Sequence, residues 1–163
     1  MLLAIDVGNT NIVIGVFRGE ALVHSWRLTT IRERTSDELG ILLTDLCNRH
    51  EIHQRDISGI VIASVVPPLT STLVTMVTDY FGRVPLLFEP AVNAGIPILI
   101  DNPAEVGADR VVNSIAAYAT YGAGRPIIVI DFGTATTFDA VSVRGEYLGG
   151  IICPGPQVSA DAL

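Results

Sequence analysis

The sequence has little basic charge and no long apolar segment. Its 163 residues carry 10 Lys and Arg against 17 Asp and Glu, a formal net charge of −7. Because the basic residues are scattered, no electropositive field is available to attract a nucleic-acid backbone. No apolar run approaches the roughly 20 residues that span a bilayer, and no basic region precedes the short apolar run at the N-terminus. We therefore expect a cytoplasmic protein that binds neither nucleic acid nor membrane.

Several common kinds of functional site are also missing. Cys47 and Cys153 stand far apart and in no CxxC or CxxH spacing, so neither a zinc site nor a disulfide framework is indicated. The three histidines form no metal-ligand motif, and there is no G-x-S-x-G. There is no GxxxxGK[ST], and the glycines at 122 and 124 lack the third glycine of a dinucleotide fingerprint. P-loop and Rossmann sites are therefore excluded.

Apolar residues are plentiful, at 49% of the chain, and their spacing predicts an α/β protein with helices covering a sheet. Short apolar runs bounded by turn residues predict strands at 2–7, 12–17, 21–28, 59–66, 85–88, 127–130, 137–143 and 147–152. Apolar residues at helical spacing predict helices that end near 48, 81 and 121, starting near 36, 69 and 108.

Two parts of the chain repeat one pattern. Asp-Val-Gly-Asn-Thr-Asn at 6–11 and Asp-Phe-Gly-Thr-Ala-Thr at 131–136 each follow an apolar run, and an Arg-Gly-Glu turn comes twelve and thirteen residues after the respective Asp. The separation is too long for a solenoid, whose period is about 20–50 residues. We expect two domains with the same core, the first at 1–109 and the second at 110–163, with the second incomplete at its C-terminus.

The repeated Asp-Gly loops have the composition of a phosphate site. Each strand delivers a carboxylate to its end, and the glycine that follows lets backbone N–H groups approach an oxyanion. A carboxylate beside amide donors suits a cation that is shared with phosphate oxygens. One such loop by itself is better explained as a tight turn with a local hydrogen bond. The second copy favours two loops that grip one polyphosphate.

The segment 102–110 precedes a predicted helix, where unpaired N–H groups and the helix dipole favour an anion. Asp109 is suited to accept a proton from a substrate hydroxyl, and Arg110 to pair with a carboxylate or phosphate. A capping Asp followed by a surface Arg explains the same pair. The segment 34–38, Arg-Thr-Ser-Asp-Glu, is most simply a capped helix start.

Five motifs, in this order and at these intervals, resemble those of type III pantothenate kinases: DVGNTN (6–11), RTSDE (34–38), DNPAEVGADR (101–110), DFGTATTFD (131–139) and GGIICPG (149–155). The resemblance covers essentially the whole chain. It implies the duplicated ribonuclease-H-like core of the actin, sugar-kinase and heat-shock chaperone superfamily, with mixed sheets and flanking helices. It also implies a homodimer that phosphorylates pantothenate with ATP to 4'-phosphopantothenate, the first step of coenzyme A biosynthesis.

The resemblance implies a role for each matched residue. Asp109 is the general base, and Asp131 is a ligand of a monovalent cation, K⁺ or NH₄⁺. Asp6 lies near the Mg²⁺-nucleotide. The residues implied to bind ATP are Asp6, Val7, Gly8, Asn9, Thr10, Asn11, Ile12, Val13 and Thr134, and those implied to bind pantothenate are Ile100, Gly107, Ala108, Asp109 and Arg110.

The sequence departs from the family pattern in two ways. Many family members have an aromatic residue just before the Asn-Pro pair, where this chain has Ile100 and Asp101. Members also continue beyond Leu163, so we expect this chain by itself to hold the adenosine of ATP poorly and to be inactive.

Two alternative functions stay open. One alternative is a non-catalytic regulatory homologue that binds a nucleotide or a partner protein. The other is a kinase of the same superfamily with a different small acceptor.

Overall fold

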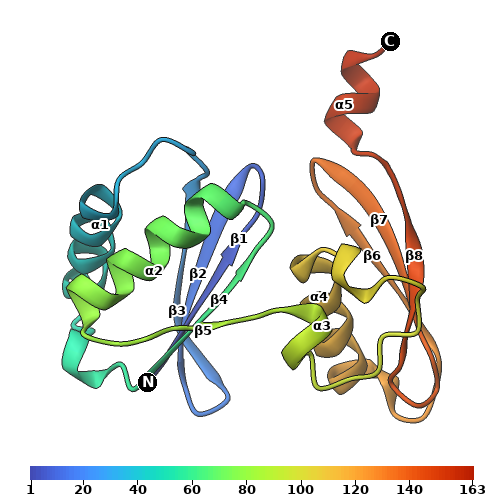
Figure 1. The fold of residues 1–163 in the computed structure, drawn as a ribbon, viewed down its shortest axis with the longest axis horizontal. Helices are drawn as coiled ribbons and strands as arrows, with labels where there is room; N and C mark the ends of the chain where they lie inside the picture. The colour runs from blue at the N-terminus through green and yellow to red at the C-terminus, as the bar shows by residue number, and fades with distance from the viewer. The chain divides into compact units, whose positions relative to one another are not determined.

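A computed structural model describes all residues from Met1 to Leu163 and divides them into two compact units, Met1–Leu87 and Phe88–Leu163 (Figure 1). The division therefore falls earlier than the boundary expected after residue 109. The reason is local packing: the backbone N–H of Leu99 donates to the carbonyl of Tyr147, so the segment before residue 109 belongs with the later strands.

The first unit is built on a five-stranded sheet with the order β3-β2-β1-β4-β5. The first three strands form the expected antiparallel meander, whereas β4 and β5 run parallel to β1. The strands are β1 (Leu2–Val7), β2 (Asn11–Arg18), β3 (Ala21–Thr29), β4 (Gly59–Ser64) and β5 (Leu86–Leu87).

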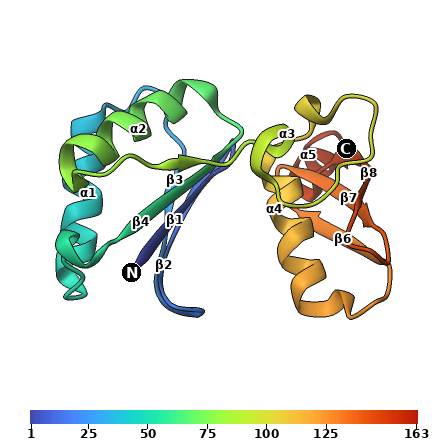
Figure 2. The same cartoon turned by 60° about the horizontal axis from the view of Figure 1, so that its bottom comes forward.

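Two helices, α1 (Ser36–Arg49) and α2 (Pro67–Phe81), lie on one face of this sheet (Figure 2). Side chains alternate between the faces of a strand, so every second residue of β1 meets the helices. Leu3, Ile5 and Val7 are accordingly only 0%, 2% and 0% exposed. A short 3₁₀-helix at Gln54–Asp56 connects α1 to β4. The core of the unit is therefore the layer between the sheet and its two helices.

The ends of these helices follow the local sequence. Thr35 and Glu38 form a capping box at the start of α1, with the Thr35 N–H 2.8 Å from a Glu38 carboxylate oxygen. Helix α2 begins at Pro67, slightly before the predicted start near 69, because proline fits the first helical turn. Gly82 ends α2 in the left-handed conformation, with φ of 59°.

The second unit contains an antiparallel three-stranded sheet with the order β6-β7-β8. The helix α4 packs on one face of it, and the predicted helix 108–121 continues from α4 as a π-helix at Tyr118–Gly122. The sequence did not predict the short helices α3 and α5. The elements are α3 (Pro90–Asn93), a 3₁₀-helix (Pro103–Glu105), α4 (Ala108–Ala117), β6 (Ile127–Phe132), β7 (Ala135–Val141), β8 (Tyr147–Pro154) and α5 (Pro156–Asp161).

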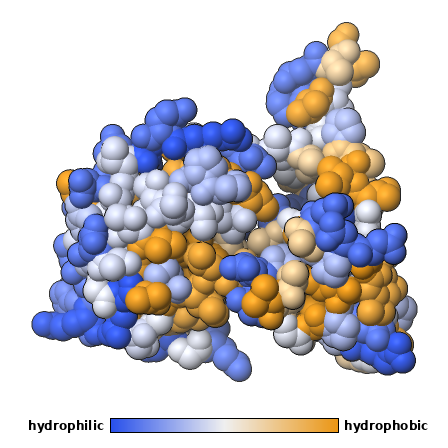
Figure 3. Space-filling view, in the orientation of Figure 1, coloured by the Kyte–Doolittle hydropathy of each residue, from blue (hydrophilic) through white to orange (hydrophobic).

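The face of the second sheet opposite α4 is apolar and exposed. Matching the two Asp-Gly loops makes Ile128, Ile130 and Phe132 the equivalents of the buried residues of β1. In the second unit they are 63%, 49% and 71% exposed. Figure 3 shows apolar side chains at the surface over this unit. No helix in either unit combines the length and apolar character needed to cross a membrane.

Candidate functional site

The first Asp-Gly loop connects β1 to β2. The last paired residues are Val7 and Ile12, so residues 8–11 form the turn. The Gly8 N–H donates to the Asn11 carbonyl at 2.9 Å, and a Cβ on Gly8 would lie 3.2 Å from that oxygen. Asp6 stands exposed at the end of β1, next to this turn. A carboxylate and a tight, glycine-dependent turn thus share one corner of the sheet.

The residue after β3 holds this loop in place. Thr30 donates its N–H to the carbonyl of Thr10 at 2.9 Å and its hydroxyl to the carbonyl of Gly8 at 2.7 Å. Arg32 donates to the side-chain oxygen of Asn9 at 3.3 Å. The loop is therefore fixed from one side, while Asn9 and Thr10 remain exposed at its tip.

The second Asp-Gly loop connects β6 to β7 and is one residue shorter. Its last paired residues are Phe132 and Thr136, which leaves 133–135 for the turn. Gly155, the residue after β8, donates its N–H to the Thr134 carbonyl at 3.1 Å. A Cβ on Gly155 would collide with the carbonyl oxygens of Gly133 and Thr134. The structure thus brings the DFGT and CPG motifs together.

Helix α4 carries Asp109, the predicted general base, and packs against the second sheet. Asp109 is partly buried in its first turn and accepts the N–H of Arg110 at 2.8 Å. Asn113 follows four residues later, on the same face of the helix. Its side-chain amide lies 3.4 Å from a carboxylate oxygen of Asp131, which is exposed at the end of β6. The candidate base and the candidate cation ligand therefore lie on one side of this unit.

Arg110 makes a buried ion pair with Asp139 of β7. Its Nε donates to Asp139 Oδ1 at 2.8 Å. Its Nη2 is 2.6 Å from the same oxygen, but at an angle that does not make a hydrogen bond. The Tyr147 hydroxyl of β8 donates to that oxygen as well, at 2.6 Å. Asp139 and Tyr147 are each 1% exposed, so two hydrogen bonds and an ion-pair contact converge on one carboxylate oxygen that is hidden from water.

The pKa values of this cluster follow from burial and from the shared carboxylate. Burial acts to lower the pKa of Arg110, but the hydrogen bond to Asp139 and its negative charge outweigh burial and raise this pKa above its usual value. Burial raises the pKa of Tyr147, and the hydrogen bond to Asp139 raises it further. At neutral pH Arg110 is a cation and Tyr147 a neutral donor.

Ile100 lies beside β8. Residues before it run parallel to that strand, with an isolated bridge between Ile98 and Tyr147, whose N–H donates to the Pro97 carbonyl at 2.9 Å. A Cβ on Gly149 would lie 3.3 Å from a methyl group of Ile100. The second unit therefore holds Ile100 together with Gly107 to Arg110, Asp131 and Thr134, whereas the loop from Asp6 to Val13 belongs to the first unit.

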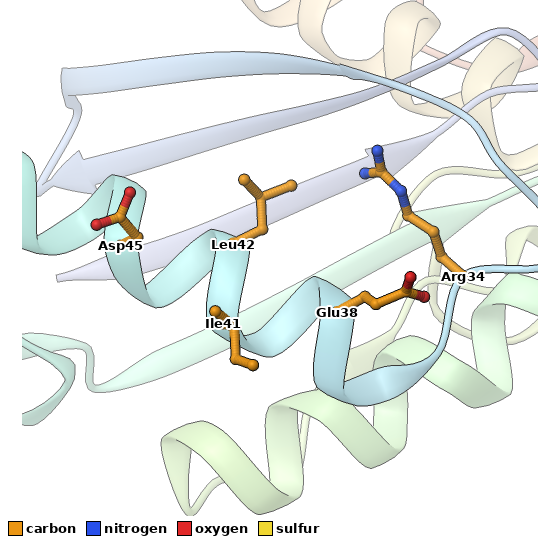
Figure 4. A pocket seen from close by; sticks show the side chains of 5 residues that line it. All are labelled: Arg34, Glu38, Ile41, Leu42 and Asp45. Atoms are coloured by element: carbon orange, nitrogen blue, oxygen red, sulfur yellow. The ribbon is translucent and has the colours of Figure 1, made fainter.

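The segment 34–38 is confirmed as a capped helix start, and it borders a surface cavity of about 540 Å³ on α1 (Figure 4). Arg34, Leu42 and Asp45 are among the residues that line it. One nitrogen of Arg34 is buried and makes no hydrogen bond. The lining also holds two carboxylates against this one guanidinium, so the cavity offers an anion no net attraction.

Comparisons with known proteins agree with these motifs. The family model described as type III pantothenate kinase matches residues 2–163. Curated relatives named type III pantothenate kinase include proteins of Moorella thermoacetica, 53% identical over 163 residues, and of Myxococcus xanthus, 55% identical over 163 residues. Each alignment covers 100% of this chain and 63% of the relative. The chain thus spans about 63% of the length of the curated relatives it matches.

Solved structures with low sequence identity share the fold. The activator of the 2-hydroxyisocaproyl-CoA dehydratase from Clostridium difficile, with bound ADPNP, has a TM-score of 0.53 at 14% identity, covering 94% of this chain and 45% of that chain. A putative N-acetylglucosamine kinase from Porphyromonas gingivalis has a TM-score of 0.51 at 12% identity, covering 93% and 47%. These likenesses show the fold and confirm the expected α/β architecture.

Proposed function

Because the chain belongs to the type III pantothenate kinase family, we propose that the whole protein transfers the γ-phosphoryl group of ATP to the terminal hydroxyl of pantothenate, which forms 4'-phosphopantothenate for coenzyme A biosynthesis. The observation that carries this proposal is the arrangement of the second unit, where Asp109 stands in the first turn of α4 and Asn113 of the same helix face contacts Asp131. Phosphoryl transfer needs positioned charge more than a covalent nucleophile, and these residues supply it.

We assign the loop from Asp6 to Val13 to the phosphates of ATP, with Thr134 as a further ATP contact. The fit rests on a glycine that a Cβ would crowd, on exposed polar residues at the loop tip, and on a carboxylate at the end of β1. Asp6 would face the Mg²⁺ of the nucleotide, and Asp131 would hold K⁺ or NH₄⁺. Such cations would neutralise phosphate charge as the γ-phosphoryl group is transferred.

We assign Ile100 and Gly107 to Arg110 to pantothenate. Asp109 accepts the proton of the substrate hydroxyl as that oxygen attacks the γ-phosphorus, and the N–H of Arg110 keeps the Asp109 carboxylate in place. Gly107, the residue before α4, has no side chain to cap the helix, so the backbone N–H groups of the first turn lack a side-chain acceptor from this position. The apolar side of Ile100 borders the place of the acceptor.

We further propose that each unit represents one ribonuclease-H-like domain and that the second is incomplete in this chain. Leu3, Ile5 and Val7 are buried beneath α1 and α2, whereas their equivalents in β6 have no helix layer over them. The additional length of the relatives is sufficient for such a layer. The whole protein would act as a homodimer in the cytoplasm, as the resemblance implies; sedimentation of the extended protein tests the dimer.

The decisive experiment is a coupled assay of ADP release by a version extended to the full length of the family. Pantothenate would be present or omitted, in K⁺ and in Na⁺ buffers, and the 163-residue chain would be measured beside it. We expect turnover that depends on pantothenate and K⁺ in the extended protein, and none in the shorter one.

Asp109→Asn in the extended protein should lower turnover by roughly 10²–10⁴-fold while ATP binding stays nearly intact. Asp79→Asn, at an exposed position of α2, is the matched control and should change neither. Equal turnover of Asp109→Asn and wild type would refute the assignment of the base. A folded extended protein without turnover would refute the kinase and favour a regulatory homologue.

A further inference from the structure

The first turn of α4 lacks the usual means of fixing a helix start. Gly107 precedes it and offers no side-chain hydrogen bond to the unpaired N–H groups. Arg110 instead connects this turn to the sheet. Its charged side chain pairs with Asp139, which lies 29 residues away on the central strand β7. The position of the first turn, and of Asp109 in it, therefore depends on a residue of another element.

We propose that Asp139 and Tyr147 are positioning residues that act through Arg110, and that together they set the place of Asp109 for proton transfer. This inference rests on the proposed kinase function and deepens it. The buried Asp139 carboxylate accepts a hydrogen bond from Arg110 Nε and lies within ion-pair distance of Nη2.

Burial and close packing around Asp139 fix the position of the Arg110 guanidinium. The carboxylate is 1% exposed, so water cannot replace a lost donor, and Tyr147 supplies a second donor from β8. A Cβ on Gly150, the residue paired with Asp139 across the sheet, would lie 2.5 Å from Arg110 Nη2 and 2.7 Å from Asp139 Oδ1. The guanidinium thus occupies the space that a side chain at 150 would need.

The test uses two substitutions in the extended protein that change few atoms. Asp139→Asn keeps the shape of the side chain but removes its charge, and Tyr147→Phe removes one donor. Tyr118→Phe is the matched control, because the Tyr118 hydroxyl also donates at 2.7 Å, but to the Val143 carbonyl outside this cluster. Misplacement of a catalytic group by about 1 Å costs on the order of 10²-fold in rate.

We expect kcat to fall roughly 10–100-fold in Asp139→Asn and less in Tyr147→Phe, with the KM for ATP close to that of Tyr118→Phe, all measured at a temperature where each variant is fully folded. In the background Arg110→Lys, Asp139→Asn should cause little further loss, because residues that act through one another are not additive. A full additional loss in that background, or an unchanged kcat in both single variants, would overturn the inference.

Activity alone does not decide the matter. The Arg110 Nε–H resonance in a ¹⁵N spectrum of the same extended protein should exchange slowly in wild type and Tyr118→Phe and rapidly in Asp139→Asn. If wild type releases no ADP, the proposed function fails by itself, and rapid exchange of this proton in wild type would separately overturn the positioning contact.

Discussion

We expect the same substitution to cost different amounts of stability at two equivalent isoleucines, one in each unit. Ile5 and Ile130 occupy matching places before the Asp-Gly loops, but Ile5 is 2% exposed and Ile130 is 49% exposed. Replacement of a buried isoleucine by alanine removes about 0.8 kcal/mol for each of the three carbons lost and adds a cavity term, for about 2–5 kcal/mol in all. At Ile130, half the side chain already contacts water and no closed cavity forms, so we expect about 1 kcal/mol.

The measurement compares Ile5→Ala and Ile130→Ala in the 163-residue chain and in the extended protein. Trp26, the single tryptophan, lies in β3 and reports urea unfolding of the first unit by fluorescence. Hydrogen exchange of the β7 amides reports the stability of the second unit. If the missing layer covers β6 in the longer protein, Ile130→Ala should become as costly there as Ile5→Ala.

The refuting outcome is specific. A cost of Ile130→Ala that stays near 1 kcal/mol in the extended protein would mean that no segment of the chain packs on this face. The proposed completion of the second domain would then fail, although the fold of the first unit would stand. Ile5→Ala serves as the internal control, because its cost should be the same in both lengths.

Three further predictions concern single residues. Gly40→Ala should destabilise the first unit by about 1–3 kcal/mol in urea, because a Cβ there would overlap the Tyr80 ring; a gain in stability would contradict this packing. Only Cys153 should react with a thiol reagent at pH 8 in the native 163-residue chain, because Cys47 is buried and burial raises the pKa of its thiol to about 11; two reacting thiols would show that the first core opens readily. The pKa of Tyr147 is raised in the folded protein, so the neutral Tyr147 hydroxyl stabilises the fold. This contribution is fully present below the unfolded-state pKa of about 10 and is lost as the pH rises above it, because the unfolded chain then loses its proton more readily than the folded one. Tyr147→Phe should weaken that alkaline loss, measured as the urea midpoint between pH 8 and 11, and an identical decline would refute it.

The elements with strong periodic patterns were predictable from sequence. The strand Leu2–Val7 has the predicted bounds, and α1 begins at the predicted capping box. The helices α3 and α5 have only 4 and 6 residues, too few for a periodic signal. The division at Leu87 has no local signal in the sequence, because it depends on a bridge between Ile98 and Tyr147, two residues that lie far apart along the chain.

The motifs of the candidate site were predictable from the sequence, but the residues that hold the site's side chains in place were not. Asp109 and Arg110 stand out because they lie at the start of a predicted helix, and Asp131 because it follows an apolar strand. The sequence alone indicates no role for Asp139 and Tyr147, because the role of an aspartate within a strand depends on a partner that the sequence does not identify. A charged residue inside an otherwise apolar strand was the available signal, because such a residue is rarely buried unless it is paired.

The internal repeat extends beyond the motifs to the way in which each loop is held. Thr30 follows β3 directly and donates its N–H to the carbonyl of Thr10, and Gly155 follows β8 directly and donates its N–H to the carbonyl of Thr134. In each unit, the residue after the third strand thus fixes the Asp-Gly loop after the first. Gly155 makes this contact so closely that a side chain would collide with the loop, whereas Thr30 adds its hydroxyl to the Gly8 carbonyl. The same backbone hydrogen bond, made with different side chains, therefore holds both turns in place beside their carboxylates.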